Sequence, residues 1–94
     1  MPPERVAVAY ILRPKGVVGE VRAEVLTHDR RRFDAVDRVV VQRPRQADQE
    51  LRLERWRPDG EHVLLKFAGI DTPEDARARL AGAYVTVAGT EVPP

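Results

Sequence analysis

The architecture of this chain follows from residues 13–22, which read Arg13-Pro14-Lys15-Gly16-Val17-Val18-Gly19-Glu20-Val21-Arg22. An apolar run precedes this stretch, and a run that alternates between apolar and charged residues follows it. Alternation with a period of two is typical of a half-buried β-strand. Pro14 fixes its own φ at about −65°, and Gly16 and Gly19 can adopt the positive φ that a Cβ makes costly. The stretch therefore predicts two strands joined by a constrained turn.

The rest of the chain adds four predicted strands, at residues 38–43, 50–57, 62–67 and 83–87. Trp56 falls on the charged side of the alternation in the second of these strands. Either a β-bulge near Arg55 or a tryptophan exposed at the rim explains that position. A core or rim position is favoured over a base-stacking one, because no second aromatic residue lies near Trp56 in the sequence.

One helix is predicted between Thr72 and Gly82. Thr72 can cap its first turn, Pro73 suits the first helical position, and Gly82 suits a left-handed ending. Asp29 can likewise cap a short turn through residues 30–36. Six short strands, tight turns and one short helix predict an all-β fold, a six-stranded antiparallel β-barrel, because closing the sheet removes edges that a small domain cannot cover.

Composition limits the classes of function. The 94 residues suffice for one domain, and the absence of cysteine excludes disulfides and thiolate chemistry. The chain also lacks serine, and His28 and His62 do not have the spacing of a metal pair. No catalytic residue, metal site or cofactor is therefore predicted. The N-terminus shows no signal-peptide pattern and no apolar run is long enough to span a membrane, so a cytoplasmic protein is expected.

The net charge of +1 is unevenly distributed. Residues 1–57 carry 13 Lys and Arg against 9 Asp and Glu, which gives +4, and residues 58–94 carry 3 against 6, which gives −3. Such a layout can orient a domain toward a phosphate-rich partner. Arginine supplies 14 of the 16 basic residues, and a GC-rich coding bias is the alternative explanation for the basic half.

Three motifs resemble the RimM family of ribosome maturation factors. The family's Pro-His-Gly-x-x-Gly-Glu-x-Arg turn is matched at Pro14, Gly16, Gly19, Glu20 and Arg22, although Lys15 replaces the histidine and Ala9 replaces a glycine usual in the preceding strand. Residues 67–82 resemble its Gly-Ile-Asp corner, helix and Leu-x-Gly stop, and residues 27–33 follow its Thr-x-Asp-x-x-x-Phe spacing. The motifs cover most of the chain in the family's order.

The resemblance implies a barrel like those of translation elongation factors over residues 1–90. Residues 91–94 would then begin a linker to a C-terminal PRC-type barrel that this chain does not include. The implied function is that of a monomeric, non-enzymatic assembly factor, without membrane contact, that binds the immature small ribosomal subunit and aids 16S rRNA processing and assembly of the subunit head. It would contact the head protein numbered nineteen mainly through the second domain. The alternative is a generic single-stranded nucleic-acid-binding barrel.

Candidate contact residues follow from charge and position. The hypothesis of a surface that faces ribosomal RNA involves Arg13, Lys15, Arg22, Arg30, Arg31 and Arg32. An apolar rim that contacts protein would consist of Val17, Val18 and Leu64, where strand alternation turns Leu64 outward unless the helix covers it. A purely structural turn, with Val17 and Val18 packed on the barrel mouth, is the alternative.

Overall fold

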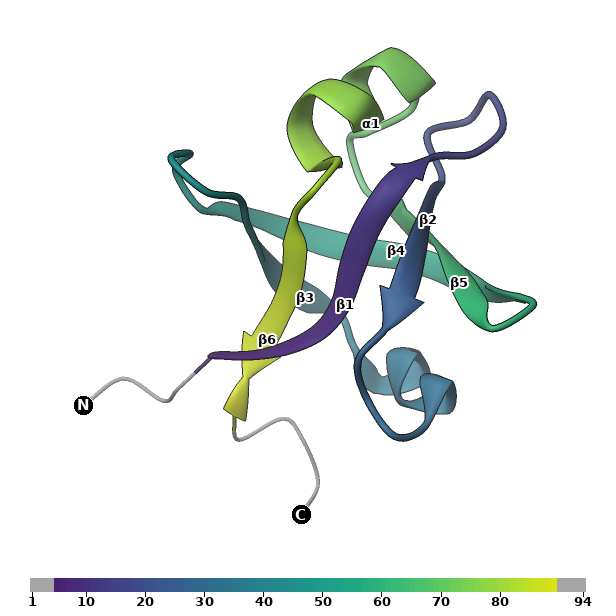
Figure 1. Ribbon diagram of the computed structural model, residues 1–94, viewed down its shortest axis with the longest axis vertical. Coiled ribbons are helices and arrows are strands. Elements are labelled where there is room, and N and C mark those ends of the chain that lie inside the picture. The colour runs from purple at the N-terminus through teal and green to yellow at the C-terminus, as the bar shows by residue number, and fades with distance from the viewer. Residues whose placement is uncertain (1–4, 90–94) are drawn as a thin grey trace.

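The computed structural model describes residues 5–89, which form six antiparallel strands, one 3-10 helix and one α-helix (Figure 1). The strands are β1 (Arg5–Pro14), β2 (Val21–Val25), β3 (Arg38–Gln42), β4 (Gln49–Asp59), β5 (His62–Phe67) and β6 (Tyr84–Ala88). The helices are η1 (Arg30–Ala35) and α1 (Pro73–Leu80). The expected linker at residues 91–94 lies outside the described residues.

The strands close into a barrel in the order β1-β2-β5-β4-β3-β6. All six neighbouring pairs are antiparallel, and the ring closes where β1 pairs with β6, with Arg5 opposite Ala88. The predicted fold class is thus confirmed. Figure 1 shows α1 and η1 at opposite ends of the barrel.

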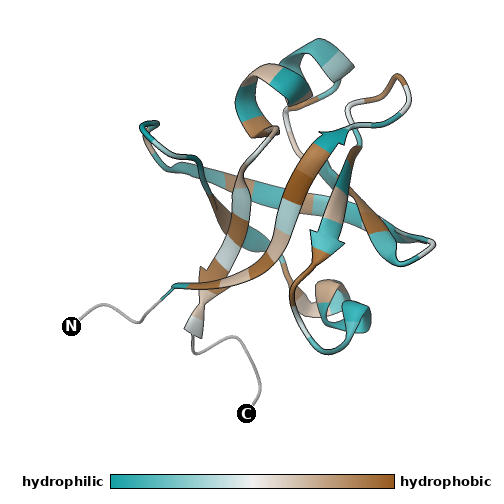
Figure 2. Cartoon of the chain, viewed as in Figure 1, coloured by the Kyte–Doolittle hydropathy of each residue, from teal (hydrophilic) through white to brown (hydrophobic). Residues whose placement is uncertain are grey.

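The barrel interior is filled by the apolar residues of the alternating strands. Val21 and Ala23 of β2 are fully buried, as are Val63, Leu65 and Phe67 of β5. Figure 2 shows hydrophobic and hydrophilic segments succeeding one another along the strands, as a sheet with one face inside and one outside requires. The alternation that follows the Gly16–Gly19 turn thus places Val21 and Ala23 inside the barrel.

A bulge in β4 resolves the position of Trp56. The register between β4 and β5 shifts between Leu53 and Arg55, which reverses the alternation beyond that point. Trp56 is therefore partly buried and packs against the core, with its ring centroid 5.8 Å from that of Phe33 in η1. Of the two explanations that the sequence left open for Trp56, the bulge near Arg55 is the one observed.

Both helix starts are capped as predicted. Thr72 Oγ1 accepts a hydrogen bond of 3.1 Å from the backbone N–H of Asp75, and Pro73 occupies the first turn. Asp29 Oδ1 accepts one of 2.9 Å from the backbone N–H of Arg31 at the start of η1. Gly82 follows α1 with a φ of 79°. Of the residues that the structure describes, none belongs to a helix long and apolar enough to cross a membrane.

Leu64 is buried, with only 2% of its surface exposed, so its assignment to an exposed rim is wrong. Strand alternation does turn it away from the interior, where Val63 and Leu65 point. Its neighbours in the sheet are Arg22 of β2 and Arg57 of β4. Long side chains that flank a residue on the same face can cover it with their aliphatic stems.

Candidate nucleic-acid interface

The turn between β1 and β2 is held rigidly. The Lys15 N–H donates a hydrogen bond of 2.8 Å to the Glu20 carbonyl, which closes the turn. Gly16 and Gly19 both have positive φ, at 76° and 93°. A Cβ on Gly19 would stand 2.3 Å from the carbonyl oxygen of Ile70, because the turn packs directly on the backbone between β5 and α1. Only glycine fits this contact.

The tip of this turn presents two valines to solvent. Val17 is 81% exposed and Val18 is 44% exposed. The interpretation in which both valines pack on the barrel mouth is therefore wrong. With Leu64 buried, the candidate apolar rim reduces to these two residues.

Lys15 and Arg22 converge on one carboxylate, that of Asp59 at the end of β4. Lys15 Nζ lies 3.1 Å from Oδ1 and Arg22 Nε lies 3.3 Å from Oδ2. The hydrogen bond from Lys15, followed by the charges of Lys15 and Arg22, holds the pKa of Asp59 below its usual value. Arg13 lies opposite Arg22 in the ladder and is exposed, and no ion pair of Arg13 is found within residues 5–89.

A second ion pair ties the turn to the barrel wall. Arg57 donates from Nε and Nη2 to the two carboxylate oxygens of Glu20, at 3.2 and 3.0 Å. Glu20 is only 7% exposed, so its charge needs this partner. The hydrogen bond from Arg57 lowers the pKa of Glu20, which keeps the carboxylate ionised despite its burial.

The arginines of η1 have different surroundings. Arg30 donates from Nη1 to the backbone carbonyls of Gly60 and His62, so it ties η1 to the turn between β4 and β5. Arg31 is highly exposed and pairs with Asp29 at 3.0 Å, and its side-chain and backbone hydrogen bonds lower the pKa of that carboxyl. Arg32 is partly buried.

The structure thus brings three of the six candidate cations, Lys15, Arg22 and Arg30, to the β4–β5 turn, and it places Arg13 opposite Arg22 in the neighbouring ladder. We call these residues the basic cluster: Arg13, Lys15, Arg22 and Arg30. Sequence reasoning missed Asp59, which neutralises part of this charge, because Pro58-Asp59-Gly60 has the pattern of a turn and nothing more. Guanidinium and ammonium groups gathered in this way can bind phosphate.

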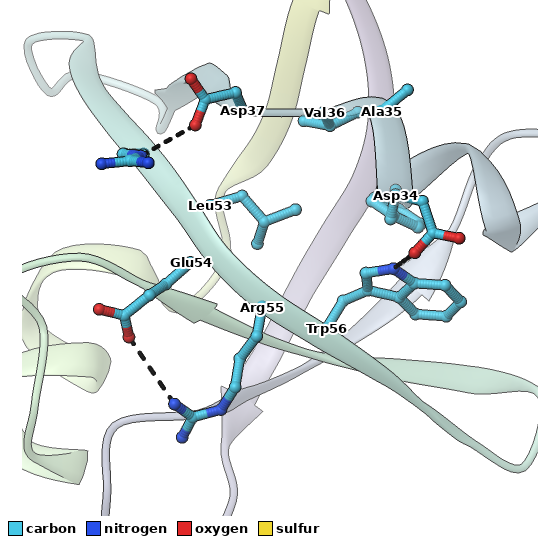
Figure 3. Close-up of a pocket in the computed structure, with 10 residues that line it drawn as sticks. Asp34, Ala35, Val36, Asp37, Leu53, Glu54, Arg55 and Trp56 are labelled. Carbon is cyan, nitrogen blue, oxygen red and sulfur yellow. Dashed lines mark hydrogen bonds and ion pairs between the residues drawn. The ribbon is translucent and has the colours of Figure 1, made fainter.

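A cleft of about 450 Å³ lies between η1 and β4, and sequence reasoning also missed it. Figure 3 shows its lining, with Leu53 near the centre and Trp56 on one side. The indole Nε1 of Trp56 donates a hydrogen bond of 2.7 Å to Asp34 Oδ1. The only signals in the sequence are Phe33 and Trp56 themselves, which the fold alone brings together. Within residues 5–89, no group of three or more potential metal ligands is found.

Comparison with known sequences identifies relatives over nearly the whole chain. The family model of the RimM N-terminal domain matches residues 6–91. The ribosome maturation factor RimM of Heliobacterium modesticaldum is 36% identical over 91 residues, which are 96% of this chain and 53% of that protein. The ribosome maturation factor RimM of Myxococcus xanthus is 33% identical over 85 residues, which are 90% of this chain and 45% of that protein. The chain thus spans about half the length of these relatives.

Solved structures share the fold. The RimM protein of Pseudomonas aeruginosa superposes with a TM-score of 0.87 at 24% identity, over 96% of this chain and 54% of that one. The N-terminal domain of RimM from Thermus thermophilus gives a TM-score of 0.73 at 19% identity, over 97% of this chain and 96% of that one. At these identities the likeness concerns the fold alone.

Proposed function

This chain belongs to the ribosome maturation factor RimM family, whose N-terminal domain it matches, and from that premise we propose that it serves in assembly of the small ribosomal subunit. It binds the immature subunit and aids 16S rRNA processing and assembly of the head. The family match over residues 6–91 carries this proposal. The barrel supports it by presenting an exposed basic surface on rigid elements.

The protein acts as a cytoplasmic, monomeric binding factor that catalyses no covalent step. In the complete protein a PRC-type barrel follows residues 91–94 and makes most of the contact with the head protein numbered nineteen. The length of the relatives, about twice that of this chain, supports a second domain.

The RNA contact is assigned to the basic cluster together with Arg31 and Arg32. Arg13 and Arg31 are exposed members of this set, and both stand near the ends of regular elements that fix their backbones. Lys15 and Arg22 share Asp59, so a phosphate that reaches them competes with this carboxylate. Phosphate contacts of this kind position a protein on RNA without reading its sequence.

Co-sedimentation tests the proposed function. The chain is mixed with immature small subunits, mature small subunits or protein-free 16S rRNA, and the bound fraction is measured at several salt concentrations. A preference for immature subunits is expected. Equal binding to all three, and to an unrelated single-stranded RNA, would instead identify a generic nucleic-acid-binding barrel.

Matched variants test the RNA surface. The double variant Arg13→Ala, Arg31→Ala should reduce the slope of log affinity against log salt by about 0.7–0.9 for each phosphate that the protein no longer binds. The variant Arg77→Ala is the control, because Arg77 is an exposed arginine on α1 that does not belong to the basic cluster. A control effect half as large as that of the double variant, and so equal for each charge removed, would mean that only the total charge matters.

A further inference from the structure

We propose that the cleft between η1 and β4 binds one unpaired nucleobase, with Trp56 as its stacking surface. The inference rests on the proposed function in taking RNA as the ligand. The basic cluster would contact the phosphates of this RNA, and the cleft would contact one of its bases. The cleft is separate from the basic cluster and is lined by ten residues of η1, β4 and the segment between η1 and β3.

The size and the walls of the cleft suit a flat, partly polar ligand. Its volume of about 450 Å³ falls within the range of roughly 300–1,000 Å³ that is usual for small-molecule sites. Leu53 lies near the centre of the lining but is only 7% exposed, so most of the exposed lining is polar. Charged side chains also line the cleft: Asp34, Asp37, Glu54 and Arg55, which Figure 3 labels, and Arg52. Polar groups of this kind can orient a heterocycle by hydrogen bonds, and Trp56 would supply the aromatic surface.

Trp56 is fixed in place before any ligand arrives. Trp56 is partly buried against the core beside Phe33, whose own ring is almost fully buried, so Trp56 is the aromatic residue of the lining that can meet a ligand. The hydrogen bond from its Nε1 to Asp34 fixes the ring from the other end. Unpaired bases of RNA stack on aromatic side chains held in this way.

The carboxylates of the cleft should make it selective for certain bases. Asp34 accepts the indole hydrogen bond with Oδ1, and an ionised carboxylate has further lone pairs that can accept from a ligand. The same oxygens repel the carbonyl oxygens of a ligand, because an ionised carboxylate has no hydrogen to donate. Cytosine and adenine present an exocyclic amino group, whereas uracil presents a carbonyl at the same place. The cleft should therefore prefer cytosine or adenine to uracil.

Arg55 is suited to the phosphate of the bound nucleotide. Its Nη1 lies 3.8 Å from Glu54 Oε2, which leaves most of its donors unused by that contact, and the side chain is 56% exposed. Arg52, by contrast, is engaged with Asp37 at 2.9 Å. A guanidinium beside a stacked base can pair with the phosphate that follows it.

The protein carries its own reporter for this site, since Trp56 is its single tryptophan. The emission of Trp56 is recorded while the chain is titrated with oligo(C) or oligo(U) of equal short length, and binding of labelled oligomers is followed in parallel by anisotropy. Saturable quenching is expected with both, with affinity for oligo(C) higher on the order of tenfold. The substitution Asp34→Asn keeps an acceptor for the indole but adds amide donors, so it should abolish or reverse this preference.

Two further variants separate the groups of the cleft from general charge. Arg55→Ala should weaken the binding of oligonucleotides without changing the preference for cytosine, and it replaces an exposed side chain, so folding should be unaffected. Arg77→Ala on α1 should change neither affinity nor preference. Unchanged affinity and preference in both Asp34→Asn and Arg55→Ala would overturn the proposal.

The remaining outcomes distinguish this proposal from the proposed function. Oligonucleotides that bind by anisotropy without changing the emission of Trp56 would overturn the cleft as a base site and leave ribosomal binding intact. Quenching by immature subunits but not by any oligonucleotide would assign the cleft to a protein segment, which also overturns it. If the unmodified chain binds neither immature subunits nor oligonucleotides, both proposals are refuted.

Discussion

Replacing Gly19 by alanine should destabilise the chain far more than replacing Gly16 by alanine. Both residues have positive φ, and an alanine in that region costs roughly 1–2 kcal/mol. A Cβ on Gly16 meets open space. A Cβ on Gly19 would stand 2.3 Å from the Ile70 carbonyl oxygen, and the next two nearest atoms are also backbone, so no side chain can rotate away. Overpacking of this kind costs a further 1–3 kcal/mol or so.

Urea denaturation followed by the emission of Trp56 measures the difference. Gly16→Ala should lower the free energy of unfolding by about 1–2 kcal/mol, and Gly19→Ala by about 2–5 kcal/mol. In thermal melts, each kcal/mol lowers Tm by roughly 4–8 °C in a domain of this size. Equal losses in the two variants would show that the contact with Ile70 is not rigid, and no loss in either would refute the argument from φ as well.

Leu64→Ala should cost about 2–4 kcal/mol in urea denaturation, and Val17→Ala at the exposed turn less than about 0.5 kcal/mol; similar values would mean that Leu64 is not packed. The lowered pKa of Glu20 stabilises the fold above its unfolded pKa of about 4.3, and this contribution is lost as pH falls through the lower folded value. Glu20→Gln should therefore flatten the loss of stability in acid, and an unchanged acid profile would contradict this. Asp59→Asn should strengthen binding to immature subunits, because it frees Lys15 and Arg22 for phosphate; weaker binding would exclude these two cations from the interface. Thermal unfolding of the chain alone should be a single cooperative transition, and a flat melt would show that the core is incomplete.

The elements that the sequence predicted well are those set by neighbours in the chain. The caps at Asp29 and Thr72 depend on backbone N–H groups two and three residues away, so their residue types suffice to place them. The turn at Gly16 and Gly19 needs backbone angles that other residues avoid. The bulge near Arg55 was also detectable in the sequence, because Trp56 falls on the charged side of the alternation there.

The candidate site was harder to predict because its residues come from distant segments. Alternation says which side of its own strand Leu64 occupies, but not that Arg22 and Arg57 flank it. Asp59 and its partner Lys15 are 44 residues apart in the sequence, and Trp56 and its partner Asp34 are 22 residues apart. Such encounters depend on the order of strands around the barrel, which local patterns do not contain.

Closure of the barrel by its first and last strands bears on how the protein folds as it is synthesised. β1 and β3 each pair with β6 on one side, and β6 is synthesised after both of them. A nascent chain that ends before residue 84 therefore leaves two unpaired edges exposed, and the ring can form only once the complete domain has left the ribosome.

The same pairing of β1 with β6 places Arg5 opposite Ala88. A circular permutant could therefore join these two positions with a short peptide and begin at a new terminus in an exposed loop, and every pair of strands would be preserved.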